Sequence, residues 1–151
     1  MDNTYKITTH SDAETIEVAQ NLEAEKFPNM VICLNGDLGS GKTVFTKGFA
    51  SAMAIDEVTS PTFNIIKEYN GELPLYHLDV YRTNGHVEDL GIPEYFDKGG
   101  VTIIEWAEMI EDILPEERLD ITFKITGENS RVMVITPRGE KYISACEEAL
   151  W

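Results

Sequence analysis

The chain has 151 residues, which fits one folded domain and leaves no room for a second catalytic domain. Its 27 acidic and 12 basic side chains give a formal net charge of −15, which argues against direct, unaided binding of nucleic acid. No apolar stretch approaches 18 residues, and the N-terminus lacks the basic and apolar regions of a signal peptide, so no membrane association is expected. The two cysteines, Cys33 and Cys146, fit neither a disulfide framework nor a metal cluster, so we expect buried thiols in a cytoplasmic protein.

The first third of the chain alternates between strand-like and helix-like patterns. Apolar residues recur first with a period of two, then at helical spacing, then as an unbroken run before a glycine-rich loop. The pattern predicts, in order, an edge strand over 4–9, a helix from Ser11 or Asp12 to about Lys26, a strand over 30–34 and a helix from Thr43 to about Ala54.

The loop between this strand and this helix matches G-x-x-x-x-G-K-[ST]. Glycines at these positions let backbone N–H groups converge on phosphate oxygens, and the following helix adds its positive N-terminal end. The lysine then reaches the β- and γ-phosphates, and the final hydroxyl takes one Mg²⁺ position. The alternative is a glycine-rich turn with an exposed lysine. The loop consists of Gly36, Asp37, Leu38, Gly39, Ser40, Gly41, Lys42 and Thr43.

The rest of the chain predicts further strands around short helices. In order, we expect strands over 63–69 and 73–81 joined at an Asn-Gly turn, helical pieces over 86–97 broken at 91–93, a central strand over 101–104, an acidic helical face over 105–117, strands over 119–126 and 131–136, and a terminal helix from about Gly139. The whole predicts an α/β fold of the single-domain P-loop NTPase class over 1–151, with a mixed central sheet that includes an antiparallel hairpin and is flanked by helices.

A metal in such a site needs a second protein contact, normally a carboxylate at the end of a neighbouring strand. Glu105 follows a buried strand and fits this position; the alternative is a solvated strand end. Asp79 competes with it, or forms a local salt bridge to Arg82. One carboxylate can hold the metal while the other orients or deprotonates water, and the sequence leaves the division open.

Three further side chains have both a functional and a structural interpretation. Thr62 follows Ser-Pro in the loop where switch threonines of NTPases contact the γ-phosphate, or it simply begins a strand. Trp106 covers a nucleotide or partner site, or belongs to the core. His77 is more typical of a hydrogen-bonded structural histidine than of a general base.

Five motifs together closely resemble the TsaE (YjeE) family. They are Gly-Asp-Leu-Gly-Ser-Gly-Lys-Thr at 36–43, Ser-Pro-Thr-Phe at 60–63, His-Leu-Asp-Val-Tyr-Arg at 77–82, Leu-Gly-Ile-Pro-Glu-Tyr-Phe at 90–96 and Ile-Ile-Glu-Trp-Ala at 103–107. The resemblance implies a weak Mg²⁺-dependent ATPase, with ATP and Mg²⁺ as cofactors. It implies a role in bacterial synthesis of N6-threonylcarbamoyladenosine (t6A) at position 37 of tRNA, together with the TsaB and TsaD proteins, so that tRNA is reached only through the complex.

The resemblance also implies residue roles. It puts residues 36–43 on the triphosphate, Thr43 and Glu105 on Mg²⁺, Thr62 at a switch, and Asp79 and Trp106 at the catalytic site or its rim. The adenine contacts implied are Ser11, Thr15 and Arg138. Two other functions stay open: a small-molecule phosphotransferase, although no arginine cluster of the kind kinases use is visible, and an adaptor that binds nucleotide without turnover.

Overall fold

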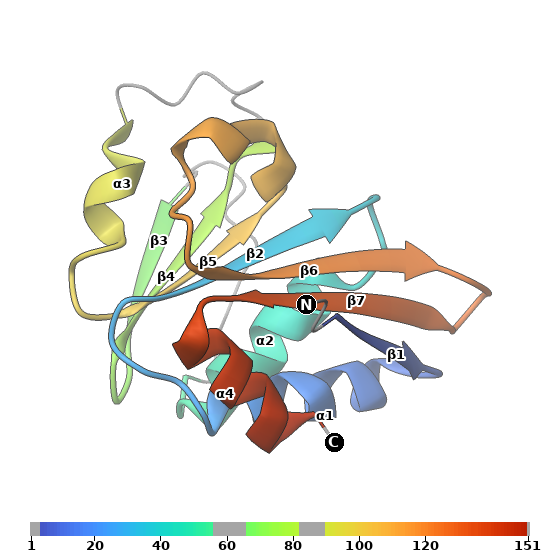
Figure 1. Ribbon diagram of the computed structural model, residues 1–151. Helices are drawn as coiled ribbons and strands as arrows, with labels where there is room; N and C mark the ends of the chain where they lie inside the picture. The colour runs from blue at the N-terminus through green and yellow to red at the C-terminus, as the bar shows by residue number, and fades with distance from the viewer. Residues whose placement is uncertain (1–3, 56–65, 82–89, 151) are drawn as a thin grey trace.

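The strands that the structure describes form one mixed, seven-stranded sheet in the order β1-β7-β6-β2-β5-β4-β3 (Figure 1). The structure is a computed structural model, and it describes residues 4–55, 66–81 and 90–150. The elements are β1 (Tyr5–Thr9), α1 (Asp12–Glu23), β2 (Met30–Gly36), α2 (Lys42–Ala52), β3 (Ile66–Asn70), β4 (Pro74–Asp79), α3 (Ile92–Tyr95), β5 (Val101–Glu105), the 3₁₀ helix η3 (Ala107–Ile113), β6 (Arg118–Ile125), β7 (Arg131–Arg138) and α4 (Glu140–Ala149).

The centre of the sheet is parallel and its margins are antiparallel. Strand β2 lies between β5 and β6 and runs parallel to both, and β4 continues the parallel set beside β5. The hairpin β3-β4 and the pair β6-β7 are antiparallel, and β1 pairs with β7 at the edge. The predicted mixed sheet with an antiparallel hairpin is therefore confirmed. Because ligands of open α/β sheets bind at the carboxyl ends of parallel strands, a binding site is expected at the ends of β2, β5 and β4.

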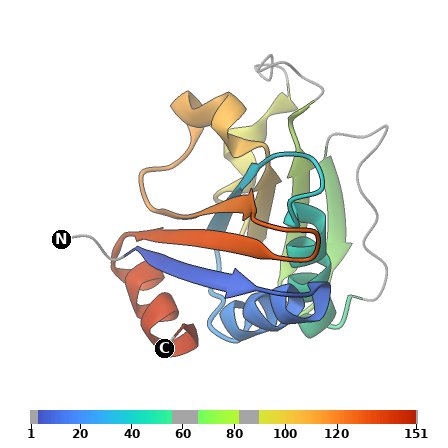
Figure 2. The ribbon, with the colours of Figure 1, turned by 90° about the vertical axis from the view of Figure 1, so that its right-hand side faces the viewer.

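Helices α1, α2 and α4 cover one face of the sheet, and α3 and η3 cover the other (Figures 1 and 2). Alternate residues of each central strand face opposite layers, as the pleat of a strand requires. On β5, Ile103 joins the core under α1, α2 and α4, whereas Ile104 joins the smaller cluster with α3 and η3. The fully buried Phe45 and Phe49 anchor α2 to the sheet.

Two short helices differ from the sequence prediction. The predicted break at 91–93 is the start of α3: Gly91 precedes it with φ 65°, and a proline occupies its first turn, where its missing N–H costs no hydrogen bond. The predicted acidic helical face over 105–117 is the shorter η3, which is kinked at Ile110 (φ −132°). Helix α1 ends at Glu23 rather than near Lys26, since the chain must turn there toward β2.

Both cysteines are buried, as predicted, Cys33 on β2 and Cys146 on α4. Burial raises the pKa of the Cys33 thiol, and it raises the pKa of Cys146 to about 12, so both stay protonated and unreactive at neutral pH. Within the described ranges, no helix combines the length and apolar character needed to cross a bilayer.

Candidate active site

The glycine-rich loop joins the carboxyl end of β2 to the first turn of α2. Gly36 has φ 141°, and a Cβ there would lie 2.6 Å from the carbonyl oxygen of Phe123 on β6. Gly41 precedes α2 with φ 113° and no side chain caps the helix. The N–H groups of the first turn of α2 therefore have neither an intrahelical partner nor a side-chain cap, which is the arrangement that binds anions.

Lys42 lies folded into this loop. Its Nζ donates to the carbonyl oxygens of Gly36 and Asp37, the latter at 3.0 Å, and sits 4.0 Å from the ring centroid of Trp106. Burial lowers the pKa of Lys42, while nearby carboxylates, Glu105 first, act in the opposite direction. The ammonium group of Lys42 therefore contacts two uncharged carbonyl oxygens and one aromatic ring. Phosphate oxygens can replace these partners because hydrogen bonds between two charged groups are stronger.

The hydroxyl of Thr43 meets the carboxylate of Glu105. Thr43 Oγ1 donates to Glu105 Oε1 at 3.1 Å, so the second residue of α2 is joined to the last residue of β5. The other oxygen of Glu105 lies 2.5 Å from Nε2 of His77 on β4. The predicted pairing of the loop threonine with a strand-end carboxylate is thus present in the geometry.

Asp79 is the neighbour of Glu105 across the β4-β5 pair. Together with Lys42, Thr43 and Glu105 it lines a cavity beside the loop, and its Oδ1 accepts a hydrogen bond from the backbone N–H of Tyr81 at 3.1 Å. Desolvation raises the pKa of Asp79, and the charge of Glu105 adds to the rise. The two carboxylates occupy different places: Glu105 contacts Thr43, whereas Asp79 stands beside it at the end of the next strand. The alternative partner, Arg82, lies outside the described residues.

Trp106 turns the chain back over the loop. Its φ of 64° is unusual for a large side chain, and its N–H bonds to the carbonyl of Leu34 at 2.9 Å. The ring faces Lys42 on one side and lies 4.6 Å from the ring of Tyr81. A strained backbone held at the mouth of a cavity is typical of functional positions. Trp106 combines both interpretations: it is partly buried and packs against the core cluster under α3 and η3, and it also lines the cavity.

Arg131 is a cavity residue that the sequence reasoning missed. It begins β7, and its Nη2 donates to the carbonyl oxygen of Gly39 at 3.1 Å while its Nη1 holds the carbonyls of Gly127 and Ser130. No local sequence pattern indicates this position, because it depends on β6 pairing parallel to β2, which puts the β6-β7 turn at the loop edge of the sheet.

The cavity beside the loop has a volume of about 360 Å³. Its lining residues come from α1, the loop, α2, β4, the end of β5 and the start of β7. They are Asp12, Leu38, Gly39, Gly41, Lys42, Thr43, Val44, Asp79, Glu105, Trp106 and Arg131.

Comparison with known proteins gives the family of the chain. The sequence profile described as "Threonylcarbamoyl adenosine biosynthesis protein TsaE" matches residues 9–133. The chain belongs to the TsaE family. It is 50% identical over 145 residues to the "tRNA threonylcarbamoyladenosine biosynthesis protein TsaE" of Bacillus subtilis, covering 95% of this chain and 92% of that protein. It is 35% identical over 136 residues to the protein of the same name from Haemophilus influenzae, covering 85% and 84%.

One solved structure is similar over nearly the whole chain. The crystal structure of YdiB from Bacillus subtilis superposes with a TM-score of 0.87 at 45% sequence identity, covering 99% of this chain and 95% of that one. This likeness over the full chain establishes the P-loop α/β fold, whose loop, β5 end and β4 end form the cavity described above.

The residues implied as adenine contacts by the TsaE resemblance lie at different places in the fold. Ser11 caps α1 and lies next to Asp12, which lines the cavity. Thr15 is 2% exposed, and its hydroxyl lies 2.9 Å from that of Thr9, so it serves the packing of α1 against β1.

Thr62, the predicted switch threonine, lies outside the described residues, and its role stays a prediction.

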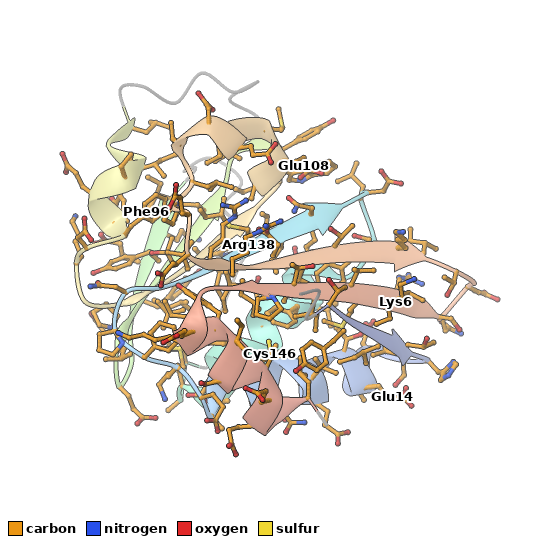
Figure 3. The ribbon with its side chains drawn as sticks, viewed as in Figure 1. Lys6, Glu14, Phe96, Glu108, Arg138 and Cys146 are labelled. Carbon is orange, nitrogen blue, oxygen red and sulfur yellow. The ribbon has the colours of Figure 1, made fainter. Side chains whose placement is uncertain are left out.

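Arg138 does not reach the loop cavity. It lies seven positions after Arg131 on β7, which places the two on opposite faces of the sheet and about 20 Å apart along the strand. Figure 3 shows Arg138 and Glu108 on the face opposite the helix that carries Cys146. The guanidinium pairs with Asp120 at 2.5 Å and lines a separate cavity of about 230 Å³. The resemblance implied Arg138 because it lies just before the last helix, but its position on β7 directs it to the other face of the sheet.

The cavity of this TsaE-family chain fits a divalent cation together with a phosphate ligand. It presents three carboxylates, those of Asp12, Asp79 and Glu105, beside two cationic side chains, so a bare triphosphate would meet substantial repulsion. The oxygens of Thr43 and Glu105 are ligands that Mg²⁺ prefers. In the described part of the chain no group of three or more His, Cys, Asp or Glu residues is arranged to hold a metal ion by itself.

Proposed function

We propose that this chain binds ATP with Mg²⁺, hydrolyses it slowly to ADP and phosphate, and thereby serves t6A modification of tRNA in the cytoplasm. One observation carries the proposal: Thr43 of the loop donates to Glu105 at the end of a neighbouring strand, 3.1 Å away, next to the buried Lys42. A threonine and a strand-end carboxylate joined in this way are the metal-side parts of P-loop NTPases. Membership of the TsaE family supplies the biological setting.

Each part of the site has a proposed role. The loop N–H groups and Lys42 hold the triphosphate, and Thr43 with Glu105 holds Mg²⁺, directly or through water. When bound, Mg²⁺ neutralises charge on the β- and γ-phosphates. Asp79, free of contact with Thr43 and lining the cavity, orients or deprotonates the attacking water. Trp106 covers the phosphate end.

The proposed partner is the TsaB–TsaD complex, which this chain acts on rather than modifying tRNA itself. The net charge of −15 makes a basic partner surface attractive and tRNA repulsive. ATP offers a physical source of switching, because a γ-phosphate held by Lys42 displaces that side chain from the ring of Trp106 at the cavity mouth. Thr62, the predicted switch threonine, is the second group proposed to respond to the γ-phosphate.

The partner proposal predicts nucleotide- and salt-dependent association. With purified TsaB and TsaD, we expect binding that is tighter with ATP and Mg²⁺ than with ADP or no nucleotide, faster ATP hydrolysis in the mixture, and weaker association as salt rises through 0.1–0.5 M. The chain alone is expected to give no tRNA gel shift at physiological salt. Equal partner affinity in all nucleotide states would contradict the switch.

A kinase is the main alternative and has its own signature. Among the described residues, Arg131 is the one arginine that lines the cavity, so the arginine-rich acceptor side that kinases use is not present there. Transfer of labelled γ-phosphate to a small metabolite, in place of release as inorganic phosphate, would support the kinase. Nucleotide binding with no phosphate release, alone or with partners, would support the adaptor, against which the two cavity carboxylates argue.

Replacing Arg131 by alanine should weaken ATP binding about tenfold. The variant loses the charge-assisted bond to Gly39, which fixes the loop tip, at a cost of about 1.5 kcal/mol. Titration calorimetry with ATP and Mg²⁺ measures the change. Arg138→Ala, on the same strand but in the other cavity, is the matched variant and should bind ATP as the wild type does. The reverse result would restore Arg138 as the nucleoside contact.

A further inference from the structure

The buried histidine on β4 contacts the same carboxylate as the loop threonine. His77 is 0% exposed, and its Nε2 lies 2.5 Å from Oε2 of Glu105. It stands two residues before Asp79 on the same face of β4, facing the layer that contains α2. The Glu105 carboxylate is therefore held at both oxygens, by the Thr43 hydroxyl on Oε1 and by the His77 ring on Oε2.

The contact links the tautomer of His77 to the state of Glu105. When Glu105 is ionised it only accepts hydrogen bonds, and Nε2 of His77 is then the donor. The other nitrogen, Nδ1, is buried and has no partner among the described residues. Glu105 is thus the one polar side chain that the described structure places against the ring.

Sheet stability alone does not explain a histidine here. Strands β4 and β5 already pair through the full register from Leu75–Val101 to Asp79–Glu105, so a side-chain bond between them adds little to the alignment. A half-satisfied polar ring in the core costs free energy that a phenyl ring of similar size would avoid. The group that does depend on His77 is the Glu105 carboxylate, which is 3% exposed and would otherwise leave one oxygen unpaired.

The nearest competitor for Glu105 is Lys42. Both side chains line the cavity, and Glu105 is the carboxylate that acts most strongly on the Lys42 charge. Yet the described residues show no ion pair between them: Lys42 bonds to loop carbonyls and Glu105 bonds to Thr43 and His77. If Glu105 were free to turn, it would pair with Lys42 and draw both groups away from phosphate and metal.

We infer that His77 is a positioning residue for the metal side of this site: its Nε2–H holds Glu105 turned toward Thr43 and away from Lys42. The inference rests on the proposed function, since it assigns the orientation of a proposed Mg²⁺ ligand. Partners of this kind typically alter metal affinity tenfold to a hundredfold when they are removed.

The test compares ATP affinity with Mg²⁺ and with EDTA, and takes the ratio of the two dissociation constants as the gain from Mg²⁺. His77→Phe keeps the ring volume and removes the donor; His77→Gln keeps an N–H near the position of Nε2. The matched control is Thr102→Val on β5, which also removes a buried polar group without a partner among the described residues, but on the opposite face. We expect the gain to fall about tenfold to a hundredfold in His77→Phe, to recover largely in His77→Gln and to be unchanged in Thr102→Val.

The outcomes separate the positioning role from a structural one. An unchanged gain in His77→Phe, beside a normal wild-type gain, overturns the inference and leaves the proposed function standing. A wild type without any gain from Mg²⁺ overturns both. If His77→Phe fails to fold, ¹⁵N NMR of the metal-free wild type decides: a His77 ring protonated at Nε2, with a resonance that moves in Glu105→Gln, supports the inference, and a proton on Nδ1 instead overturns it.

Discussion

Lys42→Ala is expected to lower ATP affinity at least about a hundredfold, or to abolish measurable binding. Lys42 is the loop cation at the N-terminus of α2, and its Nζ has only carbonyl oxygens and the Trp106 ring as partners. Two charge-assisted bonds to the β- and γ-phosphates, each contributing about 1.5 kcal/mol or more, account for this loss. Calorimetric titration with ATP and Mg²⁺ measures it.

The same helix supplies a matched control for this prediction. Lys47 is exposed on α2, away from the cavity lining, so Lys47→Ala changes the net charge equally and should bind ATP as the wild type does. Lys42→Ala should remain folded, because burial already disfavours the charged form of Lys42, as its lowered pKa shows, and alanine suits a helix. Wild-type affinity in a folded Lys42→Ala protein would end the phosphate-loop interpretation.

The phosphate loop and the position of Glu105 could be predicted because both follow from local rules. The loop motif carries its own spacing, and Glu105 ends an unbroken apolar strand whose burial identifies it as central. Parallel strands beside the loop strand end at one edge, so a carboxylate closing such a strand comes near the loop without knowledge of the strand order.

Residues whose placement depends on pairing could not be predicted in the same way. Arg131 reaches the loop because β6 pairs in parallel with β2 and then turns into β7 at the loop edge of the sheet. The local sequence predicts neither the β2–β6 pairing nor the β6–β7 pairing. The same pairing sends Arg138 to the far end of β7 on the other face. The acidic segment after Trp106 forms η3 rather than a regular α-helix, and non-helical backbone angles at Ile110 (φ −132°) interrupt it.

The contact between His77 and Glu105 could not be predicted from either residue alone. A buried histidine on a strand is ordinarily structural, and the structure agrees that it is buried and hydrogen-bonded. Its partner is the carboxylate that also receives the Thr43 hydroxyl, and this connects the histidine to the loop through one side chain. The register that brings β4 beside β5 creates this connection, so the sequence alone could not reveal it.

Neutralising Asp79 and neutralising Glu105 are expected to have different effects, the first on turnover and the second on the dependence on Mg²⁺. Asp79→Asn should keep the affinity for ATP and Mg²⁺ while turnover falls about a hundredfold to ten-thousandfold, because the proposed water-orienting base is lost. Glu105→Gln and Thr43→Ala should instead weaken the dependence on Mg²⁺, since each removes one half of the contact between the loop and β5. Mg²⁺ titrations that overlay the wild type for Glu105→Gln would move the metal role to Asp79.

The pH dependence of kcat/KM provides an independent check on Asp79. Burial raises the pKa of Asp79, and a base works only when deprotonated, so activity should be present above this raised pKa and lost as pH falls through it. The acid limb should therefore lie above the ordinary range of aspartate, and the residual activity of Asp79→Asn should lack that limb. Because Glu105 contributes to the rise through its charge, Glu105→Gln should shift the limb toward lower pH. A limb that persists unchanged in Asp79→Asn would assign the base to another group and leave Asp79 as a hydrogen-bond acceptor for the N–H of Tyr81.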